Sequence, residues 1–484
     1  MSPASATLLG RWLRWFSGDA ECAEQTAWRA WRSDSTEPLQ TWRAHRPAWS
    51  ARLPATTLAV FALRAWLCFL TLGAFNLGCA EARGEAAAIA PAFVRVEGKH
   101  FVGADGEPLH LRGINLGNWL LPEGYMWQFE RAASPRQIEN VVAELVGDVT
   151  AAEFWRAWRD NYITRADLQL IRRVGFNSVR IPLNWRLFVT ETSPFRMEGP
   201  GWALLDRVIG WCRDEHIYAI IDLHAAPGGQ TGSNIDDSRG RPLLFEDPGA
   251  QQLTIDLWTA LAKRYRGETW VLGYDLLNEP IAHYFNQERL NPRLAEFYRR
   301  IVPAIREIDP QHVILIGGAQ WNTQFAGLGP PFADNLAYAF HLYWAKPNEA
   351  SLKRYLEWRD QFNAPMWLGE SGENTDDWLR TFRLLLDQHE IDWCFWPYKK
   401  MVESNCVASI AKPADWSAIV AYAETPRGDD YEAIRKALPS LEVSRRALAQ
   451  LLENSRLERC GINAGFLHAL GLNVPPAEGQ KAKR

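Results

Sequence analysis

Several side chains that can carry proton-transfer or nucleophilic chemistry stand where short apolar segments of this sequence end. Residues 271–280 read V-L-G-Y-D-L-L-N-E-P, a run too brief for a helix, which indicates a buried strand that delivers Asn278 and Glu279 into a loop. Glu370 closes a second such segment, in W-L-G-E-S-G-E-N. One protonated and one ionised carboxyl group can donate a proton to a leaving atom and attack its neighbour. The two glutamates therefore predict a site with paired carboxyl groups.

Four further strand-like segments end in groups of the same kind. Arg180 lies in G-F-N-S-V-R-I-P, His224 in D-L-H-A-A-P-G-G, His341 and Tyr343 in F-H-L-Y-W, and Trp396 in W-C-F-W-P-Y-K-K. A single Glu after an apolar run is usually a solvated loop residue. Six segments that all end in such groups are hard to attribute to chance.

The elements that must position these residues alternate between strand-like and helix-like patterns, which predicts a (β/α)8 TIM barrel with its chemistry at the carboxyl ends of the strands. A doubly wound open sheet is the alternative, but no Gly-rich phosphate loop follows any predicted strand. The barrel is expected over residues 92–425, with strands at 109–116, 177–182, 217–223, 271–280, 312–316, 336–341, 366–369 and 391–396, and helices at 151–174, 202–215, 250–265, 292–308, 350–361 and 376–389.

Two additions flank the predicted barrel. Residues 93–96 and 100–102 surround the turn sequence E-G-K, which indicates an N-terminal β-hairpin. Residues 426–484 are expected to form a helical C-terminal extension with helices at 431–438 and 441–452, and to fray from residue 471.

Residues 1–91 read as segments outside the folded domain. Residues 1–54 are interpreted as a poorly structured leader, or as the product of a start codon assigned too far upstream; acids interrupt the positive charge, which disfavours RNA or membrane-surface binding. Residues 55–80 are apolar and predict an export signal, and N-L-G-C ending at Cys79 resembles a lipoprotein cleavage box. Cleavage after Ala80, a retained signal anchor and a buried core helix are the alternatives. Residues 81–91 read as a tether. Lipoprotein cleavage, cleavage after Ala80 and a retained anchor all place the residues that follow outside the cytoplasm, so the chain is expected to be secreted, periplasmic or membrane-anchored.

Composition narrows the class of protein. A hydrophobic content of 47%, a charged content of 23% and a net charge of −4 indicate a globular chain and argue against a nucleic-acid binder. The seven cysteines show no C-x-x-C spacing, which disfavours a zinc site. Core thiols are the preferred interpretation, with a Cys394–Cys406 bridge as the alternative. No metal or organic cofactor is expected, and the chain is expected to be a monomer.

The motifs G-I-N-L-G-N-W-L, D-L-H-A-A-P-G-G-Q, L-L-N-E-P and F-W-P-Y-K-K resemble glycoside hydrolase family 5, the cellulase family, over residues 93–422. They are most similar to its β-glucosidase and exo-β-1,3-glucanase branches. By that resemblance Glu279 is the general acid/base and Glu370 the nucleophile. The supporting set that the resemblance implies is Arg180, His224, Asn278, His341, Tyr343 and Trp396.

Three residues outside this set are weaker candidates for sugar binding. Glu123 in L-L-P-E lies where exo-glucanase relatives carry an acid that grips a terminal sugar, and Trp119 and Trp344 are candidates for lining subsites, each weighed against plain packing or solvation. The pair Asp236 and Asp237 is interpreted as a solvated loop rather than a calcium site. At Ser371 the family more often has an aromatic residue. This difference affects how the predicted nucleophile Glu370 packs, but not which residue is the nucleophile.

The expected function is retaining hydrolysis of β-glucan-type saccharides through a covalent glycosyl-enzyme. Arg180 and Tyr343 are expected to keep Glu370 ionised, while Glu279 holds the higher pKa and the proton. Transglycosylation or glycolipid β-glucosidase activity at the same site is the alternative. A non-catalytic carbohydrate-binding barrel is disfavoured because both carboxyl groups are present.

Overall fold

The structure is a computed structural model that describes residues 92–426 and 430–475. The predictions for residues 1–54, 55–80 and 81–91 lie outside these ranges. Within them, no helix combines the length and apolar character that crossing a membrane requires.

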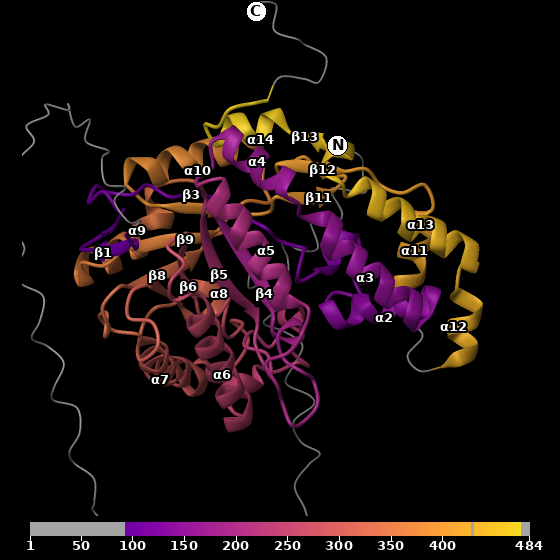
Figure 1. Cartoon of the computed structure of the whole chain (residues 1–484), viewed down its shortest axis with the longest axis horizontal. Coiled ribbons are helices and arrows are strands. Elements are labelled where there is room, and N and C mark those ends of the chain that lie inside the picture. Colours follow the sequence, from indigo (N-terminus) through magenta and orange to yellow (C-terminus); the bar gives the residue numbers. More distant parts are fainter. Residues whose placement is uncertain (1–91, 427–429, 476–484) are drawn as a thin grey trace, which may run out of the picture. The chain divides into compact units, whose positions relative to one another are not determined.

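Eight parallel strands close a barrel in the order β10-β3-β4-β5-β6-β7-β8-β9, which confirms the predicted fold class (Figure 1). The strands are short and buried on both faces, as expected for a parallel sheet covered by helices. They are β3 (Arg112–Asn115), β4 (Ser178–Asn184), β5 (Tyr218–Ala225), β6 (Val271–Asp275), β7 (Val313–Gly317), β8 (Leu336–His341), β9 (Met366–Glu370) and β10 (Trp393–Phe395).

Strand β6 is shorter than the predicted 271–280, because its ladder ends at Asp275. The chain beyond it nevertheless stays tied to both neighbouring strands. The amide of Leu276 donates to the carbonyl of Leu315 in β7, and the amide of Asn278 donates to the carbonyl of Leu223 in β5. These bonds hold the Asn278–Glu279 segment at the strand end without extending the strand.

The predicted hairpin is β1 (Arg95–Glu97) and β2 (His100–Val102), which pair antiparallel across Gly98. Gly98 has φ +60°, the left-handed conformation that such turns need. The buried side chains of Val94 and Phe101 join one apolar cluster with Ile220 and Leu315 from inside the barrel. The hairpin therefore closes the amino-terminal end of the barrel and leaves the carboxyl-terminal end for chemistry.

The predicted helix 151–174 is wrong as a single element. The chain forms α3 (Asp148–Tyr162) and α4 (Arg165–Val174), separated at Ile163 and Thr164. Thr164 and Asp167 form a capping box in which the Thr164 amide donates to Asp167 Oδ2 at 2.7 Å. An apolar stripe continues across the break, so periodicity alone does not reveal it.

The remaining helices surround the barrel, and one of them, α2 (Pro135–Val146), was not predicted. The others are α5 (Gly201–Asp214), α6 (Pro248–Tyr265), α7 (Gln287–Arg306), the short α8 (Ala319–Asn322), α9 (Glu349–Phe362) and α10 (Asp376–Gln388).

The C-terminal extension packs on the barrel's helical layer rather than standing apart. Helix α13 lies against α2 and α3, and α14 lies against α10 (Figure 1). The Asn473 amide donates to the Val174 carbonyl, so ordered contacts continue past residue 471, where fraying was predicted. The elements of the extension are α12 (Tyr431–Ala437), α13 (Leu441–Asn454), β13 (Gly461–Ile462) and α14 (Ala464–Ala469). They follow β11 (Lys399–Met401), β12 (Ala408–Ile410) and α11 (Trp416–Ala423), and β13 joins β11 and β12 in a small sheet.

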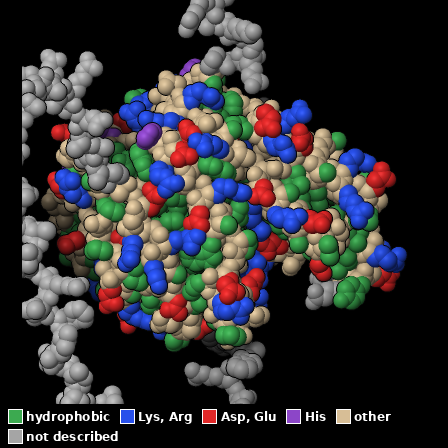
Figure 2. Space-filling model, viewed as in Figure 1, with side chains coloured by type: hydrophobic (Ala, Val, Ile, Leu, Met, Phe, Trp, Pro, Cys, Tyr) green, Lys and Arg blue, Asp and Glu red, His purple; other side chains and the backbone are tan. Residues whose placement is uncertain are grey.

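The distribution of surface charge and the state of the cysteines agree with what the composition indicated. On the face drawn in Figure 2, basic and acidic side chains are interspersed over the barrel and the C-terminal helices, so this face presents no large field of one sign. In the described ranges the cysteines Cys212, Cys394, Cys406 and Cys460 are free thiols, which rules out the alternative bridge between Cys394 and Cys406.

Candidate active site

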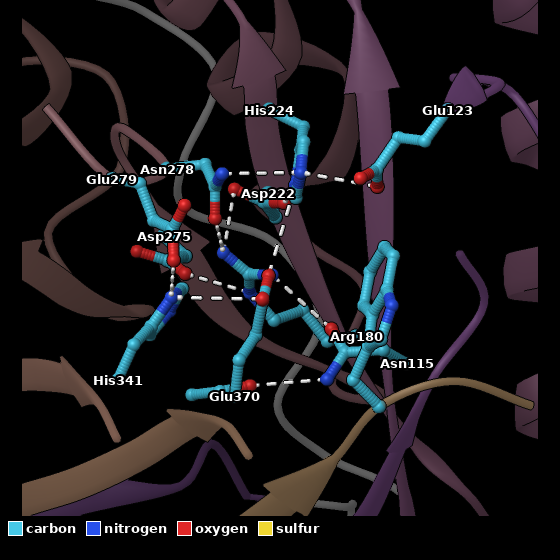
Figure 3. Close-up of polar contacts among 12 residues, drawn as sticks. Asn115, Glu123, Arg180, Asp222, His224, Asp275, Asn278, Glu279, His341 and Glu370 are labelled. Carbon is cyan, nitrogen blue, oxygen red and sulfur yellow. Dashed lines mark hydrogen bonds and ion pairs between the residues drawn. The ribbon is translucent and has the colours of Figure 1, made fainter. Parts of the chain in front are cut away.

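The predicted polar residues meet at the carboxyl-terminal ends of the barrel strands. Arg180 comes from β4, His224 from β5, His341 from β8 and Glu370 from β9, while Asn278 and Glu279 follow β6 (Figure 3). Strands that are distant in sequence bring these side chains together because parallel strands of a closed barrel all end at one rim.

Arg180 is the electrostatic centre of the site. Its side chain is fully buried and contacts three carboxylates: Nη1 donates to Glu370, Nε donates to Asp275 Oδ2 at 2.8 Å, and Nη2 lies 3.0 Å from Asp222 Oδ1. Burial acts to lower the pKa of Arg180, but the three carboxylates raise it overall. The guanidinium therefore stays charged. Burial in turn raises the pKa of Asp222 and of Asp275 to about 7, with Arg180 opposing the rise.

Both carboxylate oxygens of Glu370 receive donors. Arg180 Nη1 donates to Oε1, and the Tyr343 hydroxyl donates to Oε2 at 3.0 Å. The side chain is 6% exposed, so water contributes little to its solvation. One cation and one neutral donor compensate the negative charge and fix the direction of the carboxylate.

Glu279 has a different environment. Its Oε1 lies 3.0 Å from Nδ1 of His341, and its backbone adopts a left-handed φ of +43°, which is rare for a residue with a side chain. Burial raises the pKa of Glu279 to about 7, against the opposing influence of His224 and Arg180. Burial lowers the pKa of His341 to about 3, so this imidazole is neutral near pH 7. Glu279 therefore holds its proton in conditions where an ordinary glutamate does not.

The separation of the two glutamates is short. One carboxyl oxygen of Glu279 and one of Glu370 lie within 4.8 Å of each other, and both lie within that distance of a ring nitrogen of His341. These three groups have the composition of a metal site. However, Arg180 donates to Glu370 and His341 contacts Glu279, and the adjacent guanidinium repels a cation. The arrangement suits proton transfer better than metal binding.

Asn278 and His224 hold each other in a defined orientation. His224 Nδ1 lies 2.7 Å from Asp222 Oδ2 and therefore carries its proton there, which leaves Nε2 to accept from Asn278 Nδ2 at 3.1 Å. Asn278 Oδ1 accepts from Arg180 Nη2 at 2.9 Å. Burial lowers the pKa of His224 to about 4. A neutral imidazole and an oriented amide are the result.

Trp396 forms an aromatic wall of the site. Its ring stacks on His224 with centroids 5.7 Å apart and an interplanar angle of 16°. Its indole N–H donates to the Tyr125 hydroxyl at 2.6 Å. A Cβ at Gly117 would lie 2.4 Å from the Trp396 ring, so the glycine of the G-N-W-L motif leaves room for it.

Residues 139–401 match the family described as Cellulase (glycosyl hydrolase family 5). The chain belongs to glycoside hydrolase family 5. The match spans more than half of the sequence and contains every predicted site residue from Arg180 to Trp396, whereas Trp119 and Glu123 precede it. The protein is accordingly a glycoside hydrolase, which confirms the family and the enzyme class predicted from the motifs.

Similar proteins fall within the same class. A protein named Beta-xylosidase from Phanerodontia chrysosporium is 32% identical over 345 residues, covering 64% of this chain and 71% of its own. Endoglucanase C of Acetivibrio thermocellus is 25% identical over 304 residues, covering 50% and 85%. A probable glucan 1,3-beta-glucosidase A of Aspergillus clavatus is 29% identical over 241 residues, covering 48% and 56%.

Solved structures support the fold alone. AoRut aligns with a TM-score of 0.51 at 16% identity, covering 61% of this chain and 91% of that one. An endogalactoceramidase aligns with a TM-score of 0.50 at 18% identity, covering 75% and 84%.

The three weaker candidates of this family 5 enzyme lie in different surroundings. Glu123 is 6% exposed, its Oε1 lies 4.0 Å from His224 Nε2, and that oxygen has no hydrogen-bond partner within residues 92–426 and 430–475. Burial, followed by Glu370 and Glu279, raises its pKa well above the usual range. Trp344 is 37% exposed and its ring lies against Tyr343 at 5.2 Å. Trp119 is 1% exposed and donates its N–H to the Arg159 carbonyl, so it packs in the core, the alternative left open by the sequence.

The interpretation of Asp236 and Asp237 as a solvated loop is wrong. Asp236 is fully buried and accepts from the backbone amides of Gln230 and Thr231 and from that of Ser238. Gln230 Nε2 in turn donates to the Asn278 carbonyl at 2.8 Å, and Thr231 Oγ1 donates to the Glu279 carbonyl at 3.0 Å. Asp236 thus shapes the loop that supports the Asn278–Glu279 segment. Asp237 accepts from the Arg136 amide and from Arg186.

Sequence reasoning missed Asp222 and Asp275 as members of the site. Each is an acid within an otherwise apolar strand, in I-I-D-L-H and V-L-G-Y-D, and that interruption is the signal available for finding it. The Ser371 hydroxyl, at a position where the family more often has an aromatic residue, donates to the Leu342 carbonyl at 2.7 Å and ties the end of β9, which carries Glu370, to that of β8.

Proposed function

We propose that this glycoside hydrolase cleaves β-linked glucan-type saccharides with retention of anomeric configuration. The observation that carries the proposal is the spacing of the two glutamates, whose oxygens approach within 4.8 Å. Retaining glycosidases place their carboxyl groups about 5–5.5 Å apart, whereas inverting enzymes need about 6.5–9.5 Å to admit a water. The present spacing favours direct attack by one carboxylate.

In the first step Glu370 attacks the anomeric carbon and Glu279 protonates the glycosidic oxygen. The C–O bond to the leaving group breaks, an ester forms between the sugar and Glu370, and the proton passes from Glu279 to the departing hydroxyl. The pKa of Glu279 near 7, raised by burial, supplies the protonated acid. Arg180 and Tyr343 hold the attacking carboxylate in a single orientation.

In the second step water replaces the leaving group. Glu279, now ionised, takes a proton from the water, whose oxygen attacks the anomeric carbon and displaces Glu370. The ester converts Glu370 to a neutral group, which removes a negative charge beside Glu279 and makes its carboxylate easier to keep ionised. The same residue can therefore serve first as acid and then as base.

The remaining side chains position the sugar. Asn278 is held by Arg180 and His224 so that its amide can bond the 2-hydroxyl, an interaction that strengthens in the transition state. Trp396 offers its face as the floor of the cleavage subsite. Glu123 brings a buried carboxyl oxygen, which has no hydrogen-bond partner in the described part of the chain, to a place where a sugar hydroxyl can donate to it.

The choice of β-glucans rests on the similar proteins, which are named beta-xylosidase, endoglucanase and glucan 1,3-beta-glucosidase. Glycolipid substrates and transglycosylation use the same residues and chemistry. Product analysis on laminarin-type, cello- and glucolipid substrates separates them.

We also propose that the enzyme acts outside the cytoplasm, secreted or anchored by residues 55–80. The support is the apolar segment that ends at N-L-G-C. Fatty-acid labelling of the full chain expressed in bacteria tests the lipoprotein form: label lost in Cys79→Ser supports it, and absence of label in the wild type excludes it.

The experiment that tests the mechanism is replacement of the nucleophile. Glu370→Ala should lower hydrolysis of an aryl β-glucoside by at least about 10⁴-fold, and azide should restore turnover by giving the α-glucosyl azide. Glu296→Ala, which removes an exposed carboxyl group on α7, is the matched control and should keep wild-type activity. Full activity of Glu370→Ala would contradict the assignment.

A further inference from the structure

A second polar network lies beside the site and takes no part in the proposed mechanism. Its centre is Glu373, three residues beyond Glu370. Lys400 Nζ lies 2.5 Å from Glu373 Oε2, and Asn405 Nδ2 donates to the same oxygen at 3.0 Å. Lys400 is 7% exposed, and the Glu373 side chain is 13% exposed. A nearly buried ion pair of this kind needs specific geometry to offset desolvation, which makes its location informative.

Tyr125 connects this ion pair to the wall of the site. The indole N–H of Trp396 donates to the Tyr125 oxygen at 2.6 Å, and the Tyr125 hydroxyl donates to Glu373 Oε1 at 3.4 Å. Lys400 Nζ also lies 5.0 Å from the centre of the Tyr125 ring. The hydrogen bonds run in one direction, from indole to phenol to carboxylate. A carboxylate only accepts, so it fixes the phenol as its donor and leaves the phenol oxygen to accept from the indole.

The main chain joins the same two strand ends. The Trp396 amide donates to the Ser371 carbonyl at 2.7 Å, and Gly372 forms a parallel bridge with Trp396. Gly372 has φ +143°, and a Cβ there would lie 2.3 Å from the Trp396 carbonyl oxygen. The backbone therefore fixes the Cα of Trp396 against the nucleophile's loop. Besides the Gly117 main chain, which packs against the six-membered ring, the contacts that orient the indole plane are the His224 ring on one face and the Tyr125 hydroxyl at the nitrogen.

We propose that Glu373 is a positioning residue for the cleavage subsite: paired with Lys400, it sets the plane of Trp396 through the Tyr125 hydroxyl. This inference rests on the proposed function, because it assigns Trp396 the task of holding the sugar as the oxocarbenium-like transition state forms. If the plane of the Trp396 indole changes, the indole loses contact with the sugar ring as that ring flattens in the transition state. Small displacements of a positioning group have large effects on rate.

Three variants remove the network at different points. Tyr125→Phe deletes the link, Glu373→Ala deletes the acceptor, and Lys400→Met deletes the counter-charge. Each is expected to lower kcat/KM on an aryl β-glucoside by about 10–100-fold, the range for a misplaced positioning group. The double variant Tyr125→Phe/Glu373→Ala should lose no more than the larger single loss, because both act through Trp396. Lys400→Arg keeps the cation and should stay within about threefold of the wild type.

The affinity for a transition-state-like inhibitor separates a positioning role from a loss of protein stability, because lower stability alone does not change it. Across the series, log Ki of a gluco-configured imidazole inhibitor should rise in step with log(KM/kcat), with a slope near one, while the Ki of glucose changes little. The control is Glu139→Gln, which removes the negative charge from the Arg186–Glu139 pair of 2.8 Å outside the site and should change neither quantity. Crystal structures of Tyr125→Phe and Glu373→Ala should show the Trp396 indole rotated from its wild-type plane.

Wild-type kcat/KM in Tyr125→Phe and Glu373→Ala would overturn the proposal, as would additive losses in the double variant. An unmoved indole in the variant crystal structures would overturn it whatever the kinetics show. A different result, full activity of Glu370→Ala, would contradict the proposed function. In that case the crystal structures of the Tyr125 and Glu373 variants would still show whether the network orients the Trp396 indole.

Discussion

Glu279 and Glu370 are the same amino acid placed in opposite surroundings. Glu370 faces Arg180 and Tyr343, a cation and a hydroxyl that both donate to it. Glu279 faces a neutral imidazole instead, and burial raises its pKa to about 7. The proposed division of labour between nucleophile and acid therefore follows from one arginine that reaches one carboxylate and not the other.

The pH dependence of the enzyme should reflect this difference. The acid must be protonated for the first step, so kcat/KM should fall as pH rises through about 7 and Glu279 loses its proton. In Glu279→Gln the alkaline limb should disappear for an aryl glycoside with a good leaving group, because such a substrate does not need the acid to depart. Rates measured from pH 4 to 9 on both proteins check this. An unchanged alkaline limb in Glu279→Gln would assign the limb to Asp222 or Asp275, whose pKa values burial also raises to about 7.

At the scale of elements, β11 ties the barrel to the C-terminal extension. Lys399 is fully buried; its Nζ lies 2.6 Å from Asp167 Oδ1 and donates to the carbonyls of Tyr162 and Ser455. Tyr398 donates to the same Asp167 oxygen at 2.9 Å. The ends of α3 and α13 and the start of α4 therefore meet at one ammonium group, three residues after Trp396.

Lys399→Met should lower the free energy of unfolding by about 3–5 kcal/mol, because it leaves the buried Asp167 carboxylate without its cation. Denaturant unfolding followed by circular dichroism measures the change. The comparison is Lys436→Met on α12, which removes an exposed pair with Glu432 and should change the free energy of unfolding by less than about 1 kcal/mol. Equal changes in the free energy of unfolding in the two variants would show that the buried Lys399–Asp167 pair contributes no more stability than the exposed pair.

At the scale of the whole molecule, the extension is part of the folded domain. Leu448 and Leu451 of α13 and Phe466 and Leu467 of α14 are buried, against α2, α3 and α10. At about 1.5–3 kcal/mol for each fully buried side chain, these four contribute on the order of 10 kcal/mol. That sum is comparable to the entire stability of a typical domain, roughly 5–15 kcal/mol.

Deletion of residues 427–484 should therefore prevent folding rather than yield a smaller active barrel. Soluble yield and the thermal melting transition of the truncated protein measure the outcome. The control deletion removes residues 476–484 only and keeps the α13 and α14 contacts. A soluble, active protein ending at residue 426 would show that the barrel is a separate folding unit.

The barrel and most of the site could be predicted from sequence because their signals are local. An apolar run followed by Asn278–Glu279 or by Glu370 identifies both the strand and its chemical group, and parallel strands bring such groups to one rim. The division of 151–174 into α3 and α4 was not predictable from periodicity, because the apolar stripe continues across Thr164. Its capping box with Asp167 is the signal that decides the break.

The sequence by itself determined the alternation of strands and helices, the family and the two glutamates, since each depends on residues close together in the chain. Only the tertiary structure decided which acids surround Arg180, that Asp236 is buried, that Trp119 packs in the core, and that Glu373 reaches Trp396 through Tyr125. These depend on distances between side chains from different strands and loops. Burial and proximity to charge, which set the pKa of each glutamate, exist only once the barrel has closed.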